Sequence, residues 1–293
     1  MRRTRLLVLF GAAILIGTPA QAYYHYVHYL SGGRTGPFTP QQEKFNVAPG
    51  GTVAFFVNDQ GPTTYAAGDS FGSLLGEVKQ ALAAWDSISS PNLRVTFGGL
   101  ESSGQTSAAP GADVVFQDLP PGLLGMGAPT SNGTTIVRGT VILSNNTVLG
   151  AGPSYLEKFF TTTVHEVGHS LGLQHTWTGS AMSQDVLRNT SRARPFDADD
   201  VAAINTLYGA AGWQSNFGTI SGTVKFANGS NVTLASVVAL SPTGAAVSAL
   251  TNPDGTYRIE GIPAGNYLLY VHPLPPALRL NEVVQRCFFD RSA

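Results

Sequence analysis

Residues 165–175 read His-Glu-Val-Gly-His-Ser-Leu-Gly-Leu-Gln-His and decide the fold and chemistry expected for this chain. On a helix, His165 and His169 project from the same face, one turn apart. Gly172 predicts the end of that helix, because glycine readily adopts the left-handed conformation of a C-terminal cap. After such a break the chain can turn back and deliver His175. The pattern therefore predicts three imidazoles around one metal ion.

Three neutral imidazoles with one open coordination position are typical of catalytic zinc rather than structural zinc. Glu166 lies about 100° around the helix from His165, toward the side where a bound water is expected. A carboxylate there can accept the water's proton and later pass it to a leaving amine. Zinc lowers the pKa of the water and polarises the scissile carbonyl. We therefore predict one catalytic zinc ion on the three histidines, with Glu166 as the general base of amide hydrolysis.

The spacing H-E-x-x-H-x-x-G-x-x-H is a specific signal. With this chain's composition, its chance occurrence is on the order of 10⁻⁵. Three of the six histidines lie within it. The alternative is a helix whose histidines are surface residues or ordinary core residues. That alternative leaves unexplained why the helical pattern, the glycine break and the third histidine occur together.

Three helices are predicted from apolar residues that recur every three or four positions. They cover about 70–88, about 154–172 and about 198–208. Asp197 is the expected N-cap of the last helix, and two further acidic residues lie in its first turn. Strands rich in β-branched and aromatic residues are predicted between them. These strands are 52–58, 94–97, 113–116 and 134–143.

The extended histidine motif resembles that of the metzincin metallopeptidases, and its surroundings resemble the matrixin branch. Met182, in the run Gly179-Ser180-Ala181-Met182, is similar to the family's Met-turn, which supports the zinc site from below without binding the metal. Residues 195–209 (PFDADDVAAINTLYG) resemble the closing matrixin helix. Gly172 and Met182 are therefore expected to support the site structurally.

The resemblance covers about 50–209. It implies an α+β catalytic domain, with a mixed twisted sheet and three main helices. It also implies that the strand near 134–143 is the sheet edge that pairs with an extended peptide substrate. The alternative for this segment is an ordinary sheet strand, because edge position cannot be read from a sequence.

Some residues depart from the matrixin pattern. Thr176 follows the third histidine where matrixins usually have Ser, and neither Pro nor Tyr directly follows Met182. A catalytic tyrosine in this turn is therefore not expected. No His lies between His28 and His165, so the second, structural zinc site of matrixins is not expected. Scattered Asp residues are compatible with calcium sites but indicate none.

The chain changes in character after residue 209. Residues 210–218 read as a linker, and residues 219–273 resemble the carboxypeptidase regulatory-like (transthyretin-like) domain, a small all-β sandwich. The resemblance rests on 251–257 (TNPDGTY) and 261–267 (GIPAGNY). A spacer or stabilising role is favoured, because no binding constellation is recognisable. The alternative is a module that anchors substrate or a surface. The tail 274–293 fits neither domain.

The N-terminus is typical of a secretory signal peptide covering 1–22. Three Arg residues precede an apolar run at 6–16, and Ala20-Gln21-Ala22 fits the small-x-small cleavage pattern. The alternative is a membrane anchor, but the run is short for a bilayer span. No later stretch is long enough to span a membrane. Residues 23–49 are expected to form an N-terminal arm or a short pro-segment.

Composition narrows the class of protein. Charged residues make up only 12%, and Gly (34) and Pro (18) are abundant, as in strand-rich extracellular proteins. Without 1–22 the chain has 14 basic and 18 acidic residues, a net charge of −4, and no basic tract, so nucleic acid is not an expected partner. Cys287 is the only cysteine, which excludes a disulfide framework, a thiolate zinc cluster and thiol-based latency.

The leading hypothesis is a secreted zinc endopeptidase with protein or peptide substrates, located outside the cell, in a periplasm or on a cell surface. One alternative is a catalytically silent metzincin-fold binding protein of the cell surface or extracellular space. The intact Glu166 argues against it, because a silent site needs no base. Another is a cytosolic H-E-x-x-H hydrolase such as a deformylase, against which stand the signal peptide and His175. The sequence predicts no oligomeric state.

Overall fold

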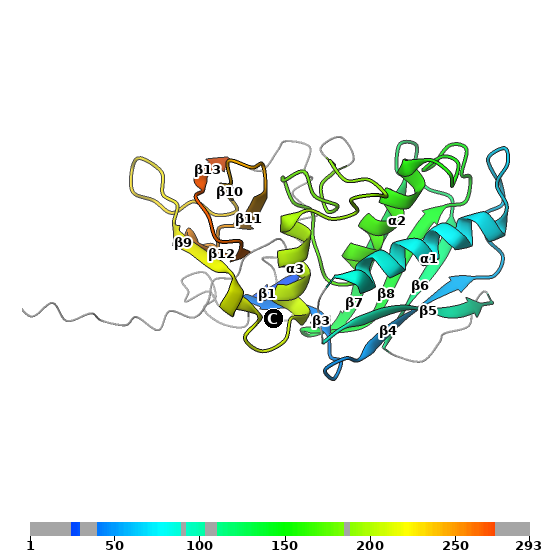
Figure 1. Ribbon diagram of the computed structural model, residues 1–293, viewed down its shortest axis with the longest axis horizontal. Coiled ribbons are helices and arrows are strands. Elements are labelled where there is room, and N and C mark those ends of the chain that lie inside the picture. The colour runs from blue at the N-terminus through cyan, green and yellow to red at the C-terminus, as the bar shows by residue number, and fades with distance from the viewer. Residues whose placement is uncertain (1–24, 30–39, 89–91, 103–109, 185–187, 273–293) are drawn as a thin grey trace, which may run out of the picture.

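The computed structural model describes residues 25–29, 40–88, 92–102, 110–184 and 188–272. The predicted signal peptide, Cys287 and the predicted tail 274–293 lie outside these ranges. Figure 1 shows a larger part with a sheet and two helices, a smaller part made of strands, and helix α3 between them. The predicted architecture, an α+β domain followed by an all-β domain, is confirmed.

A six-stranded sheet organises the larger part, in the order β3-β8-β6-β4-β5 with β7 beside β8. Its strands are β3 (Lys44–Phe45), β4 (Thr52–Asn58), β5 (Arg94–Glu101), β6 (Gly111–Gln117), β7 (Gly125–Asn132) and β8 (Thr135–Ser144). All pairings are parallel except that of β7 with β8. The sheet is therefore mixed, as predicted.

Strand β8 corresponds to the strand predicted over 134–143, but its predicted place at the sheet edge is wrong. It pairs antiparallel with β7 along its length and parallel with β6. Among the described residues, β7 pairs with no strand other than β8, so β7 is the edge. The prediction failed because β7 reads Gly-Met-Gly-Ala-Pro-Thr-Ser-Asn, with few of the residues that favour strands.

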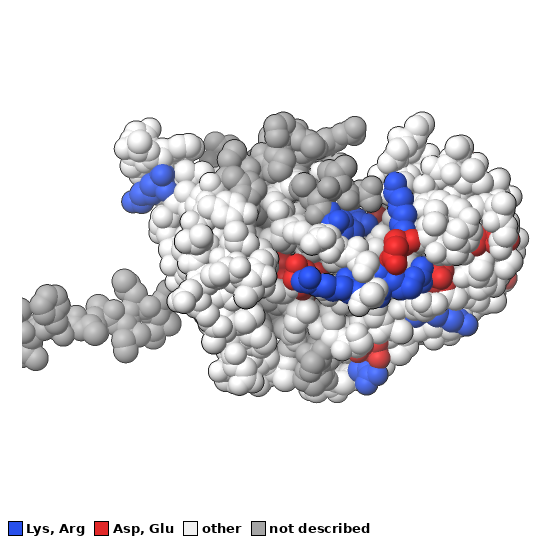
Figure 2. Space-filling model, turned by 45° about the horizontal axis from the view of Figure 1, so that its top comes forward, with Lys and Arg blue, Asp and Glu red and all other residues white. Residues whose placement is uncertain are grey.

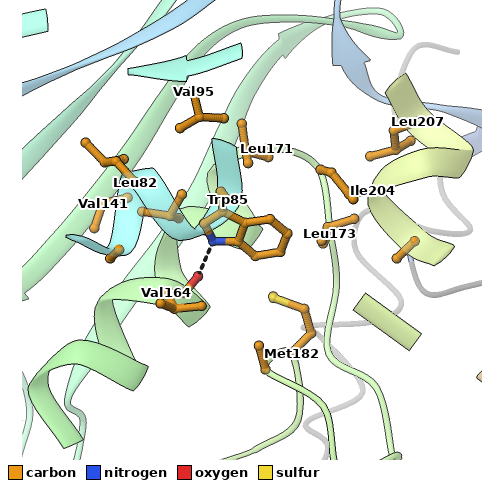
Figure 3. Packing of buried hydrophobic residues seen from close by; sticks show 14 of the residues in the cluster. Leu82, Trp85, Val95, Val141, Val164, Leu171, Leu173, Met182, Ile204 and Leu207 are labelled. Carbon is orange, nitrogen blue, oxygen red and sulfur yellow. Dashed lines mark hydrogen bonds between the residues drawn. The ribbon is translucent and has the colours of Figure 1, made fainter. Parts of the chain in front are cut away.

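Helices α1 (Phe71–Ser87) and α2 (Glu157–Ser170) pack against each other and cover one face of the sheet (Figure 1). Ser70 and Ser73 form a capping box at the start of α1, which explains why the predicted boundary is nearly correct. The Trp85 indole N–H donates to the Val164 carbonyl at 2.9 Å, which ties α1 to α2 (Figure 3). These contacts hold α2 rigidly above the sheet.

The end of α2 is where the chain turns toward His175. Gly172 has φ +106°, as the predicted C-terminal cap requires. An N-terminal arm, which includes β1 (Val27–Tyr29) and β2 (Pro40–Gln42), contacts this turn. The Tyr26 N–H donates to the Gly172 carbonyl at 3.1 Å. The arm is therefore packed directly behind the histidine motif.

Helix α3 (Ala198–Tyr208) begins after the N-cap Asp197, as predicted. A short 3₁₀ helix, η2 (Trp213–Asn216), occupies the predicted linker. The remaining strands form the sheets β11-β10-β13 and β12-β9. Their bounds are β9 (Gly218–Thr223), β10 (Ser236–Leu240), β11 (Ala246–Leu250), β12 (Thr256–Ile262) and β13 (Leu268–His272). The β11 and β12 strands contact α3, and Ser248 of β11 also contacts Thr176, so this sandwich packs directly on the larger part.

The surface carries few charges. On the face in Figure 2 most atoms belong to neither acidic nor basic residues, and several of the blue and red side chains lie next to each other. Arg192 and Glu77 form an ion pair, which links the segment before α3 to α1. Within the described residues, none of the helices combines the length and apolar character that a membrane span requires.

Candidate metal centre at the end of helix α2

Three imidazoles meet at the end of α2. His165 and His169 come from successive turns of the helix, and His175 comes from the loop that follows Gly172. Their Nε2 atoms are 3.0 Å apart for His165 and His169, 3.1 Å for His165 and His175, and 3.2 Å for His169 and His175. The structure thus brings together the three side chains that the sequence singled out, in an arrangement able to hold a metal ion.

Two of the rings are oriented by main-chain carbonyls. His165 Nδ1 lies 2.7 Å from the Ala181 carbonyl oxygen, and His169 Nδ1 lies 2.8 Å from that of Leu173. A carbonyl oxygen only accepts hydrogen bonds, so each Nδ1 carries the proton and each neutral ring has a lone pair on Nε2. Two such lone pairs face each other at 3.0 Å. That contact is repulsive between neutral rings, and a cation bound between them makes it favourable.

The site keeps its histidines neutral. Burial is the main cause that lowers the pKa of His169 to about 3 and that of His175 to about 4. Burial also lowers the pKa of His165 well below its usual value. Metal ligation requires unprotonated imidazole. Three neutral imidazoles, two of them oriented by hydrogen bonds at Nδ1, are a donor set that suits zinc.

Glu166 is buried between α2 and strand β7. The residue is only 6% exposed, and the Gly127 main chain lies against it. Burial raises the pKa of Glu166 to about 8, against the lowering effects of the Arg188 charge and of the Gly127 N–H. The Glu166 carboxyl group therefore lies on the side of α2 that β7 covers.

The close approach of β7 to α2 depends on two glycines that the sequence reading missed. A Cβ at Gly125 would lie 2.7 Å from Glu166 Cγ, and a Cβ at Gly127 would lie 2.2 Å from the Glu166 carbonyl oxygen. Positions 125 and 127 share one face of the strand, because side chains alternate. The Gly-x-Gly spacing was the available signal, since glycine inside a strand often marks a close backbone approach.

The loop that contains Met182 closes beneath the histidines. The Thr176 N–H donates to the Met182 carbonyl at 3.1 Å. Asp200 accepts hydrogen bonds from the main-chain N–H groups of Ala181 (2.8 Å) and Met182 (3.1 Å). Because the Ala181 carbonyl binds His165, Asp200 holds the turn that orients this ring. Burial raises the pKa of Asp200 to about 7, against the lowering effect of these hydrogen bonds.

The Met182 side chain packs under α2 beside Trp85 (Figure 3). A Cβ at Gly168 would lie 2.3 Å from Met182 Sδ and 2.9 Å from Trp85 Cζ2. Gly168 therefore allows the helix, the tryptophan and the methionine to meet. Met182 thus packs against the helix that bears two of the histidines, and the support of the site by Met182 and Gly172 stays a prediction.

Comparison with protein families agrees with this geometry. Residues 127–209 match the sequence model of the family described as Matrixin. Over these residues the chain is similar to the matrixins. Its residues 219–274 match the family described as Carboxypeptidase regulatory-like domain. No curated protein matches this sequence. The matrixin match runs from β7 through α3 and so includes the histidines, Glu166 and Met182; the matrixin family is a zinc-dependent metallopeptidase family.

Proposed function

We propose that this matrixin-like chain is a secreted zinc endopeptidase that cleaves peptide bonds in extracellular proteins. The observation that carries the proposal is the convergence of three Nε2 atoms within 3.0–3.2 Å of one another. His165, His169 and His175 would hold one zinc ion. Glu166 would act as the general base.

Each residue has a defined part in the reaction. When bound, zinc supplies an activated water and polarises the scissile carbonyl. The charge of bound zinc would favour the ionised form of Glu166, and this carboxylate would accept a proton from the attacking water and then transfer it to the nitrogen of the leaving amine. Strand β7 packs against Glu166 through Gly125 and Gly127 and limits the positions that its carboxylate can take. The carbonyls of Ala181 and Leu173 keep two of the imidazoles in the tautomer that ligation needs.

Strand β7 is the proposed place for the substrate backbone. Its pairing with β8 leaves its other edge without a strand partner among the described residues. An extended peptide can add to such an edge through main-chain hydrogen bonds, which give affinity without sequence preference. Because Gly125 and Gly127 lie against Glu166, a peptide on β7 passes close to the proposed base.

Secretion and the fate of the N-terminus are also part of the proposal. The signal-peptide pattern at 1–22 supports export. His25 and Tyr26, just beyond it, are buried, and Tyr26 bonds to the turn at Gly172. This packing favours an integral arm over a removable pro-segment. Residues 25–29 and 40–45 are therefore proposed to remain in the active enzyme.

The test is cleavage of an unfolded protein by the purified chain, with fragments identified by mass spectrometry. Wild type should give fragments that disappear with a zinc chelator. The Glu166→Gln variant should retain one zinc per chain and lose about 10²–10⁴-fold in rate, the usual contribution of a general base. Equal cleavage by the variant would refute the mechanism. A wild type that binds zinc and cleaves nothing would instead indicate a binding protein.

A further inference from the structure

A buried carboxylate joins the C-terminal sandwich to the histidine loop. Asp199, in the first turn of α3, is only 2% exposed. Its Oδ2 accepts hydrogen bonds from Thr176 Oγ1 (2.6 Å), Thr178 Oγ1 (2.7 Å) and Ser248 Oγ (2.9 Å), and its Oδ1 accepts one from the Ser248 N–H (2.9 Å). Two of these four donors belong to the loop after His175, and two belong to the sandwich.

The two threonines fix the loop that carries the third imidazole. Thr176 directly follows His175, and its N–H bonds to the Met182 carbonyl. Thr178 accepts a hydrogen bond from the Ser183 hydroxyl through its carbonyl. The Asp199 carboxylate therefore binds a loop segment that is also closed on itself. A shift of this carboxylate would move the residue next to His175.

Ser248 is held firmly on the other side. It lies in the middle of β11, fully buried, and its neighbours Val247 and Ala249 are also fully buried. Strand β12 packs equally closely on α3, because a Cβ at Gly261 would lie 2.8 Å from Ala202 Cβ. The apolar residues of the sandwich and of the larger part form one continuous core cluster. Ser248 therefore presents its two donors from a fixed position.

The Asp199 carboxylate needs these donors. Burial raises its pKa, and the hydrogen bonds from Thr176, Thr178 and Ser248 oppose that rise. Removing one partner of a buried polar group leaves the other with the cost of its lost hydration. Loss of the Ser248 hydroxyl would therefore weaken the positioning of the Asp199 carboxylate. It would also weaken the positioning of Thr176 and Thr178, which donate to that carboxylate.

We propose that Ser248 of the sandwich is a positioning residue of the metal centre, acting through Asp199 and Thr176 on His175. The carboxypeptidase regulatory-like domain is thereby part of the catalytic unit and more than a spacer behind it. This inference rests on the proposed zinc site. It concerns a contact between the two domains, which neither domain's sequence motif contains.

The test is zinc affinity of the full chain, measured by competition with a chelator of known affinity. Ser248→Ala removes the hydroxyl donor but keeps the N–H donor and the size of the residue. Loss of an outer partner of a metal site typically weakens binding by about 10–100-fold, and we expect about tenfold here because the contact acts through Asp199. The matched control is Ser236→Ala. Ser236 is buried in the adjacent strand β10, and its Oγ has no hydrogen-bond partner among the described residues.

A second variant separates positioning from folding. Thr178→Val removes a donor to the same carboxylate from the loop side and leaves the sandwich unchanged. It should weaken zinc binding similarly, and the double variant should weaken it by less than the product of the two effects. Thermal unfolding of the metal-free variants identifies any that fail to fold. If Ser248→Ala does not fold, the zinc affinity of Thr178→Val tests the proposal instead.

The outcomes are distinct. Folded Ser248→Ala and Thr178→Val chains that bind zinc within twofold of wild type would overturn this inference, while a wild type that binds zinc and cleaves protein would leave the proposed function standing. A wild type that binds no zinc would overturn both. Weakening in Ser248→Ala that equals the effect of Ser236→Ala would show general loosening of the sandwich, and would also overturn the inference.

Discussion

The first two histidines and the third are held in different ways. His165 and His169 are carried by one helix, and the carbonyls of Ala181 and Leu173 orient their rings. His175 lies on a loop, and its neighbour Thr176 is tied through Asp199 to Ser248, 72 residues further along the chain. Two ligands are thus placed by the same helix. The third depends on how two domains pack.

The largest expected effect is the loss of a helix ligand. His169→Ala should reduce zinc affinity by more than about 100-fold, the upper end of what loss of an outer partner does, because a direct donor is removed. Chelator competition measures it. Gln174→Ala, beside His175 on the loop, is the control and should bind zinc like wild type. A small effect of His169→Ala would mean that the helix does not supply the ligands.

The contact between α2 and β7 should not tolerate a larger side chain. Gly127→Ala would bring a Cβ to 2.2 Å from a main-chain oxygen of α2, which has no room to retreat. We expect a loss of about 3 kcal/mol in the free energy of unfolding, as for overpacking of a dense core. Urea denaturation of the metal-free chain measures it.

The matched control is Gly76→Ala in α1, where an added Cβ meets nothing within 4 Å. Because alanine is favoured over glycine inside a helix, that variant should gain about 0.5–1 kcal/mol. A Gly127→Ala chain as stable as wild type would show that β7 can move away from Glu166.

His25, in the N-terminal arm, should make the free energy of unfolding depend on pH. His25 accepts a hydrogen bond from the Gln42 side-chain N–H at Nδ1 and contacts the Ala203 carbonyl through Nε2, so the folded ring is neutral. Burial lowers its pKa from 6.5 to about 4. Between these values the unfolded chain binds a proton that the folded chain does not. Its contribution to stability is therefore complete above pH 6.5 and is lost as the pH falls toward 4.

The measurement is the free energy of unfolding with chelator present, at pH 7 and pH 4.5, for wild type and His25→Gln. Wild type should lose about 2–3 kcal/mol more than the variant over this interval. Comparing the two chains removes the contributions of other titrating groups, including Asp200 with its raised pKa. Equal losses would indicate that His25 is not buried against the loop.

The smallest effect on stability and zinc affinity is expected for a substitution of Met182. Met182→Leu nearly conserves volume, so it should lower stability by less than about 1.5 kcal/mol. Zinc affinity should stay near that of wild type, because the ring orientation of His165 comes from the Ala181 carbonyl. Thermal unfolding and chelator competition test the two statements. A tenfold loss of zinc affinity would give Met182 a direct part in positioning the ligands.

The difference between structure set by nearby residues and structure set by distant contacts also explains which features the sequence could predict. The helix that bears His165 and His169, its end at Gly172, and α3 with its N-cap Asp197 were predicted from spacing and capping residues, which act over a few positions. Strand β7 was missed because two of its positions are glycines. Contact with Glu166 requires glycine there, although glycine has a low strand propensity. The Asp199–Ser248 contact was missed because nothing local to either residue indicates the other.

The most direct test of the metal centre is zinc K-edge X-ray absorption of the purified chain, together with its zinc content. The structure predicts one zinc per chain with three imidazole nitrogens at about 2.0–2.1 Å and an oxygen ligand in the open position. The His175→Ala variant should retain two imidazoles. A spectrum with fewer than three imidazoles in wild type, or a chain that binds no zinc, would contradict the account.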